Sequence, residues 1–150
     1  MATAHNPSTA GTTAGDRRGM TPAQGFALAG GLVLVLAGLL GFLADSSFDT
    51  GSGVDGDSLL GFEVNGWHNI VHLLTGLLLL SGFRRNDTAI TVCLIFAGGY
   101  AIVTLWGLID GDDVLGLVPI NAADNVLHIV LTLAAAGAAL VSRREARSAH

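Results

Sequence analysis

Four long apolar segments alternate with short polar segments along the chain. The apolar segments cover about residues 26–44, 66–83, 88–109 and 123–141. Each is close to the roughly 17–25 residues that a helix needs to cross the hydrocarbon core of a bilayer. The pattern therefore predicts four transmembrane helices.

The connections between these segments predict how the helices pair. A tight turn at residues 84–87 joins the second span to the third. Polar acidic loops at residues 45–64 and 110–119 join the first span to the second and the third to the fourth. We therefore expect an all-α, four-transmembrane-helix bundle made of two successive helical hairpins.

The bundle is expected to occupy residues 23–142, and short tails flank it. Residues 1–22 have no hydrophobic period and are predicted to be a disordered tail. Residues 143–150 form a second, arginine-containing tail. Both tails are expected in the cytoplasm.

That orientation follows from the basic residues. All 7 are arginines, and they lie in the two tails and the middle turn, whereas the two acidic loops contain none. Because positively charged connections stay on the cytoplasmic side, both termini and the turn are predicted to be cytoplasmic. The protein is accordingly expected in the inner (plasma) membrane, with both acidic loops outside.

The composition agrees with a membrane protein and excludes several other classes. The chain is 51% hydrophobic and 13% charged, with a mean hydropathy of +0.60. A net charge of −5 disfavours a nucleic-acid partner. The single cysteine, Cys93, allows no internal disulfide and no c-type haem attachment. The expected partner is the lipid bilayer, with a second copy or another membrane protein as candidate protein partners.

One polar motif occurs twice, at the heads of the second and fourth spans. The first copy, at residues 65–72, reads Asn-Gly-Trp-His-Asn-Ile-Val-His, and the second, at residues 121–128, reads Asn-Ala-Ala-Asp-Asn-Val-Leu-His. A shift of 56 aligns them, which indicates a parallel internal duplication. The aligned polar residues are Asn65, His68, Asn69 and His72 with Asn121, Asp124, Asn125 and His128.

The spacing of these residues predicts where they lie. Asn65 and Asn121 precede the helices and are expected to be N-caps. His72 and His128 follow about two turns later, roughly 10 Å below the outer rim. Polar groups at that depth avoid lipid, and the two spans run in the same direction. The two polar faces are therefore expected to meet inside the bundle.

Three interpretations of this polar cluster stay open. Asparagine and histidine side chains could be packing elements that form hydrogen bonds between helices. They could form a metal site, because three imidazoles and one carboxylate suit zinc, copper or iron. A b-type haem could bind between His72 and His128. The metal interpretation uses His68, His72, Asp124 and His128.

The two motifs resemble those of a bacterial four-helix integral membrane family that is catalogued as a domain of unknown function. The resemblance covers about residues 24–142 and includes the motif Asn-Gly-Trp-His-Asn-x-x-His. It implies four transmembrane helices and a plasma-membrane location, and it implies no activity.

The sequence therefore favours a small, non-enzymatic structural or accessory membrane protein whose polar cluster lies inside the bundle near the outer face. The first alternative is a metal- or haem-binding membrane protein. The second is a small transporter or channel subunit, because ionisable residues within the membrane often mark a pathway.

Overall fold

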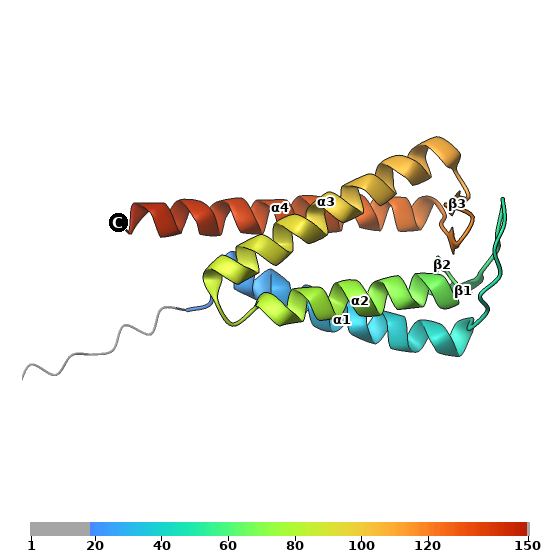
Figure 1. Ribbon diagram of the computed structural model, residues 1–150, viewed down its shortest axis with the longest axis horizontal. Coiled ribbons are helices and arrows are strands. Elements are labelled where there is room, and N and C mark those ends of the chain that lie inside the picture. The colour runs from blue at the N-terminus through green and yellow to red at the C-terminus, as the bar shows by residue number, and fades with distance from the viewer. Residues whose placement is uncertain (1–18, 150) are drawn as a thin grey trace, which may run out of the picture.

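The computed structural model describes residues 19–149, and four helices dominate this part of the chain (Figure 1). They are α1 (Pro22–Ala44), α2 (Gly66–Gly82), α3 (Asn86–Asp110) and α4 (Ala122–Ser148). α4 extends beyond the predicted end at residue 141. The tail predicted over residues 1–22 falls mostly on residues 1–18, which lie outside the described residues.

Three of the helices, α1, α3 and α4, are long and apolar enough to cross a membrane. α2 has 17 residues and lies at the lower end of the length that a span requires. Many large apolar side chains point outward from the helices; Leu43 is 83% exposed, Ile109 86% and Leu133 68%. Lipid is the solvent that suits so much outward-facing apolar surface. The fold is that of a mostly helical, multi-pass membrane protein.

The loops correct the all-α prediction, because each contains a small antiparallel hairpin. β1 (Asp57–Leu59) pairs with β2 (Phe62–Val64), and β3 (Asp113–Val114) pairs with β4 (Val118–Pro119). Both turns contain a Leu-Gly pair with positive φ. The φ angles are 55° and 92° at Leu60 and Gly61, and 60° and 65° at Leu115 and Gly116. Positive φ at such positions reverses the chain tightly, but leucine rarely adopts it. The two turns were therefore not recognisable from the residues alone.

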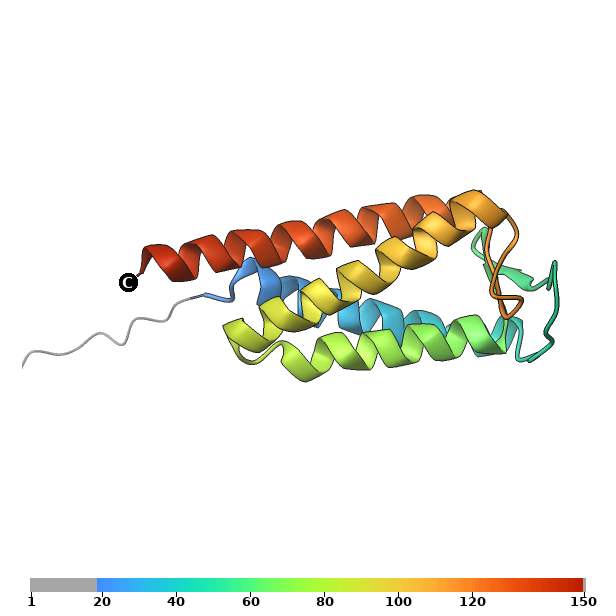
Figure 2. The same ribbon diagram turned by 45° about the horizontal axis from the view of Figure 1, so that its top comes forward.

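The helices pair as predicted, α1 with α2 and α3 with α4. Figure 2 shows α3 running obliquely from the end of α2 toward the start of α4. The core of the described residues includes Phe96 and Tyr100 of α3, whose rings stack with centroids 4.0 Å apart. Small alanines of α4 and Leu79 of α2 pack around them. The hydrophobic core therefore joins the two helical hairpins through α3.

Glycines let the helices of the first hairpin approach closely. A Cβ atom on Gly31 of α1 would lie 2.9 Å from the carbonyl oxygen of Gly76 on α2, and a Cβ atom on Gly76 would lie 2.8 Å from that of Gly31. The two backbones are therefore in direct contact, as is common where small residues face each other in membrane helices.

A glycine–asparagine contact occurs once in each helical hairpin. Any Cβ atom on Gly41 of α1 would overlap the Asn69 side chain of α2, and one on Gly107 of α3 would lie 2.5 Å from Asn125 Oδ1 of α4. Asn69 Nδ2 also donates a hydrogen bond of 2.8 Å to the carbonyl of Asp45, just after α1. Each asparagine therefore faces the other helix of its own hairpin, which corrects the expectation that the asparagines of α2 and α4 face each other.

This contact yields the first prediction. Gly41→Ala and Gly107→Ala should each destabilise the protein by about 1–3 kcal/mol, because the added methyl group enters an already filled space. The matched controls are Gly98→Ala and Gly137→Ala, where an added Cβ meets nothing within 4 Å. These controls should be neutral or gain up to about 1 kcal/mol in helix propensity. Denaturant unfolding in detergent measures all four, and equal effects in both groups would contradict the contact.

Candidate functional site

The repeated motifs begin α2 and α4, and asparagines cap both helices as predicted. Asn65 Oδ1 accepts a hydrogen bond of 2.9 Å from the backbone N–H of His68. Asn121 Oδ1 accepts hydrogen bonds of 2.8 and 3.0 Å from the N–H groups of Ala123 and Asp124. These bonds satisfy backbone donors that have no partner within the helix. They fix where each motif enters the bundle.

The same two asparagines also bind the opposite half of the chain. Asn65 Nδ2 donates a hydrogen bond of 2.8 Å to the carbonyl of Leu117, in the turn between β3 and β4. Asn121 Nδ2 donates one of 3.0 Å to the carbonyl of Gly61, in the turn between β1 and β2. The start of each helix is thus tied to the β-hairpin that precedes the other helix. We call these two contacts the crossed amide bonds.

Asp124 completes the cap of α4 and is not close to the histidines' shared centre. Its Oδ2 atom accepts hydrogen bonds of 3.0 Å from the backbone N–H groups of Asn121 and Glu63. In the aligned motif the counterpart of Asp124 is His68, and the counterpart of Glu63 is Pro119, which has no N–H to donate. The His68 ring lies beside the carbonyls of Glu63 and Pro119.

Three histidines converge between the starts of α2 and α4. The ring centroid of His68 lies 4.5 Å from that of His72 and 6.2 Å from that of His128. One nitrogen from each ring lies within 4.8 Å of those of the other two. His68 is 1% exposed and His128 4% exposed. The structure therefore brings together three of the four residues that the sequence suggested as metal ligands, and Asp124 lies outside the group. We call this group the histidine cluster.

Most buried nitrogens of the histidine cluster have no hydrogen-bond partner. By distance and angle, neither ring nitrogen of His68 completes a hydrogen bond, although the carbonyls of Glu63 and Pro119 lie beside the ring. Nδ1 of His72 and Nδ1 of His128 have no partner. A buried polar group without a partner costs about 1–3 kcal/mol. These four nitrogens therefore make no hydrogen bond to another helix.

A small cavity of about 210 Å³ lies against the histidine cluster. Tyr100 of α3 is part of its wall; the Tyr100 ring meets the His128 ring edge-on with centroids 5.1 Å apart. The Tyr100 hydroxyl lies 3.3 Å from Thr75 Oγ1 of α2. Apart from the three histidines and Tyr100, the wall is aliphatic: Val71, Val103, Val114, Leu115, Leu117 and Val118.

Sequence reasoning missed the residues that close the cavity. Tyr100 was visible as a single polar aromatic residue in the third span, but nothing in the sequence places it against His128. Leu117 and Val118 come from a β-hairpin that was interpreted as acidic loop. Their position depends on the crossed amide bond from Asn65 to Leu117, a contact between distant parts of the chain.

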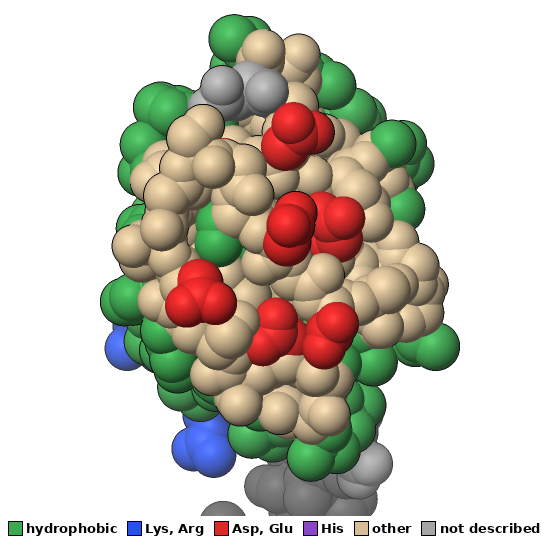
Figure 3. All heavy atoms as spheres, turned by 90° about the vertical axis from the view of Figure 1, so that its right-hand side faces the viewer, with side chains coloured by type: hydrophobic (Ala, Val, Ile, Leu, Met, Phe, Trp, Pro, Cys, Tyr) green, Lys and Arg blue, Asp and Glu red, His purple; other side chains and the backbone are tan. Residues whose placement is uncertain are grey.

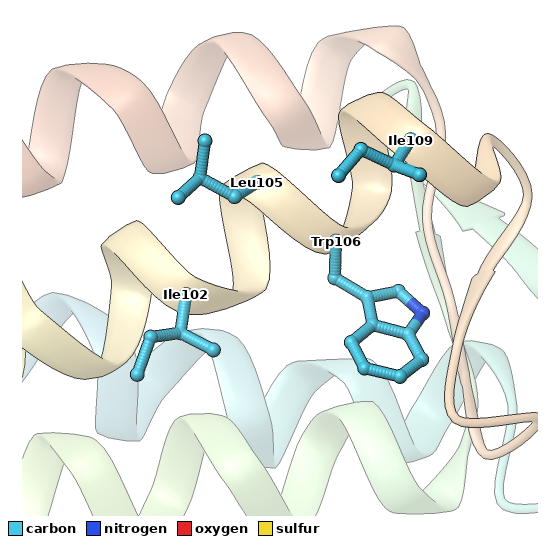
Figure 4. A pocket seen from close by; sticks show the side chains of 4 residues that line it. All are labelled: Ile102, Leu105, Trp106 and Ile109. Atoms are coloured by element: carbon cyan, nitrogen blue, oxygen red, sulfur yellow. The ribbon is translucent and has the colours of Figure 1, made fainter.

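A second apolar hollow lies along α3. It measures about 450 Å³ and is lined by Ile102, Leu105, Trp106 and Ile109. Figure 4 shows these side chains along the C-terminal half of α3. Ile102 is 66% exposed and Leu105 60% exposed, so this hollow is part of the apolar surface that suits lipid. It contains no histidine.

The end of the bundle above the histidine cluster is acidic. Figure 3 views this end and shows carboxylates spread over it, while none of the described histidines is visible. A surface of one sign raises the local concentration of counter-ions, here cations. The exposed or half-buried carboxylates of the described loops include Asp49, Asp55, Asp57, Glu63 and Asp112.

These features define a class of protein: a helical, multi-pass membrane protein with buried histidines beneath an acidic end. Residues 24–141 match the model of a protein family, and the chain therefore belongs to that family, Domain of unknown function (DUF4383). The match agrees with the resemblance to a domain of unknown function that the sequence suggested over about residues 24–142. Comparisons with curated proteins and with solved structures gave no match.

The acidic end yields the second prediction. Burial and the nearby carboxylates of Asp124, Asp55 and Asp112 raise the pKa of Glu63 above its ordinary value of 4.5. A carboxyl group whose pKa is higher in the folded state than in the unfolded state lowers the stability of the protein as the pH rises through these pKa values. The melting temperature of Glu63→Gln should therefore rise relative to the wild type between about pH 4 and pH 7.

Asp49→Asn, which removes an exposed carboxylate from the same end, is the control. Its melting temperature should follow the wild type more closely over this pH range. A constant difference between Glu63→Gln and the wild type at all pH values would contradict the role of Glu63 ionisation.

Proposed function

We propose that this protein is a membrane protein that binds a transition-metal ion, such as zinc, with His68, His72 and His128. One observation carries the proposal: three imidazoles, two buried and one half-buried, present ligand nitrogens within 4.8 Å of one another, and most of their buried nitrogens have no hydrogen-bond partner. A bound metal would supply the missing partner for one nitrogen of each ring.

The geometry suits a metal ion after a small contraction. Zinc–nitrogen bonds of about 2.0–2.1 Å in a tetrahedral site place ligand nitrogens about 3.3 Å apart. The present limit of 4.8 Å requires the rings to close by about 1.5 Å, which side-chain rotations can supply. Imidazole is a good ligand for zinc and copper. The acidic end lies on the side from which a hydrated cation would approach.

The arrangement favours a metal ion over haem. The cavity of about 210 Å³ is below the roughly 300–1,000 Å³ of typical cofactor pockets. A b-type haem also needs two axial histidines with a flat macrocycle between them. Here His68 contacts His72 and also lies near His128, so the three rings form one group.

We propose a binding role without an enzymatic reaction. The described residues that line the cavity include no carboxylate and no serine or cysteine nucleophile. The carboxylate nearest in sequence to the cluster, Asp124, accepts two backbone hydrogen bonds. It is therefore committed to holding the helix start and a β-hairpin.

The proposal places all four helices across the inner membrane with both termini in the cytoplasm. α2 lies along α1 through its length (Figures 1 and 2), which supports a fourth crossing. Arg84 and Arg85 follow α2, and Arg143 and Arg144 are near the end of α4. The repeated caps, crossed amide bonds and glycine–asparagine contacts support an internal duplication of one helical hairpin.

Cysteine accessibility tests this topology. With Cys93 replaced by alanine, a cysteine at Ser52 in the first acidic loop should react with a membrane-impermeant maleimide added outside intact cells. The matched cysteine at Ser81, near the arginine turn, should react only after the membrane is permeabilised. Labelling of Ser52→Cys from the cytoplasmic side alone would reverse the orientation.

Metal analysis tests the function. Protein purified in detergent after expression with zinc should carry about one zinc ion per chain by elemental analysis. His72→Ala and His128→Ala should each lower the zinc content at least tenfold, because two imidazoles hold zinc poorly. The control is His5→Ala, which changes a histidine outside the described residues and should retain the metal.

Folding and binding are separated by a second measurement. The melting temperature of the wild type should rise with added zinc, since a ligand that binds only the folded state stabilises it. That rise should be absent in His72→Ala. Wild-type protein without stoichiometric zinc, copper, cobalt or iron after each had been supplied would overturn the proposal.

A further inference from the structure

We infer that the cavity beside the histidine cluster binds one small neutral molecule, about the size of benzene, through a single donor atom on the metal. The inference rests on the proposed metal site and adds the chemical class of its external ligand. Three protein nitrogens leave an open position on a zinc ion, as in zinc sites that accept an external ligand.

The position of the cavity supports this assignment. All three histidines are part of its wall, so a metal held by them is next to the empty space. Tyr100 and Val103 of α3 form part of the wall, and Leu117 belongs to the turn between β3 and β4. An external ligand on the metal would therefore be enclosed by α2, α3, α4 and a β-hairpin.

The volume of the cavity limits the size of the ligand. A cavity of about 150 Å³ with apolar walls is known to accept benzene, and this one measures about 210 Å³. The space is therefore enough for a single six-membered ring and a donor atom. Drug-sized ligands occupy about 300 Å³ or more, and would not fit without rearrangement.

The apolar wall of the cavity disfavours a charged ligand. Aliphatic side chains of Val71, Val103 and Leu117 occupy much of it, and Tyr100 supplies one hydroxyl. An ionised carboxylate that leaves water for such surroundings loses far more solvation than a neutral ring does. A neutral donor is therefore preferred over an anion of the same size.

Exposed apolar residues mark the mouth of the cavity. Val71 of α2 is 37% exposed, and Leu115 at the tip of the β3–β4 turn is 64% exposed, so both are at the rim. Neither carries a polar group. A molecule that dissolves in the outer part of the bilayer would reach the cavity past these two residues.

Cobalt spectroscopy with pyridine tests the inference. Co²⁺ replaces zinc as an optical probe in the detergent-purified full chain at about pH 8, where pyridine is neutral. Pyridine should shift the visible cobalt bands with at least tenfold higher affinity than acetate. Val103→Phe fills the cavity and should weaken pyridine binding at least tenfold while one cobalt ion per chain is retained.

Two further variants sharpen the result. Val71→Trp narrows the mouth at a half-exposed position and should also weaken pyridine binding, so the test does not depend on Val103→Phe folding. Ile102→Phe is the matched control: it adds the same ring to the neighbouring position on α3, on the hollow shown in Figure 4. Its affinity for pyridine should equal that of the wild type.

The outcomes distinguish the two proposals. A wild-type protein that binds no cobalt or other metal overturns the metal site and, with it, the ligand. A protein that binds cobalt through the histidines but shows no pyridine shift overturns only the ligand assignment. Acetate binding as tight as pyridine, or unchanged pyridine binding in both Val103→Phe and Val71→Trp, overturns it as well.

Discussion

The crossed amide bonds are the contacts on which the arrangement of the β-hairpins and of the starts of α2 and α4 depends. Each of the two asparagines caps its own helix through Oδ1 and holds the opposite β-hairpin through Nδ2. The amide oxygen and the amide nitrogen of each side chain are therefore both hydrogen-bonded. Because the bonds run in both directions between the halves, the starts of α2 and α4 stay at one depth. That common depth places His128 beside the two histidines of α2.

Features of the fold that depend on local sequence patterns could be predicted from the sequence. Uninterrupted apolar segments mark the helices, and the shift of 56 aligns His72 with His128. The same shift hid the matching glycines: Gly41 precedes Asn69 by 28 residues, whereas Gly107 precedes Asn125 by 18. The longer first loop thus puts the two glycine–asparagine contacts out of a common sequence register. The asparagines could not be assigned to those glycines without the packing of each hairpin.

In the candidate site, too, local spacing predicts some of the contacts, whereas contacts between distant residues determine the others. Spacing placed His68 and His72 on one face of a helix, and the structure has their rings in contact. Spacing also grouped Asp124 with them, but the N–H of Glu63, some sixty positions away in the sequence, determines where that carboxylate lies. The strands were missed because leucines at positive φ carry their turns.

Pro119 makes the two halves of the molecule chemically unequal. At the matching place in the first half, the Glu63 N–H binds the Asp124 carboxylate; at residue 119 there is no hydrogen to offer. A carboxylate at the position of His68 would find no donor there, whereas an imidazole N–H can face the neighbouring carbonyls of Glu63 and Pro119. The missing N–H of Pro119 thus distinguishes the second half of the chain from the first. A carboxylate that caps a helix occupies this place in one half, and a buried imidazole occupies it in the other.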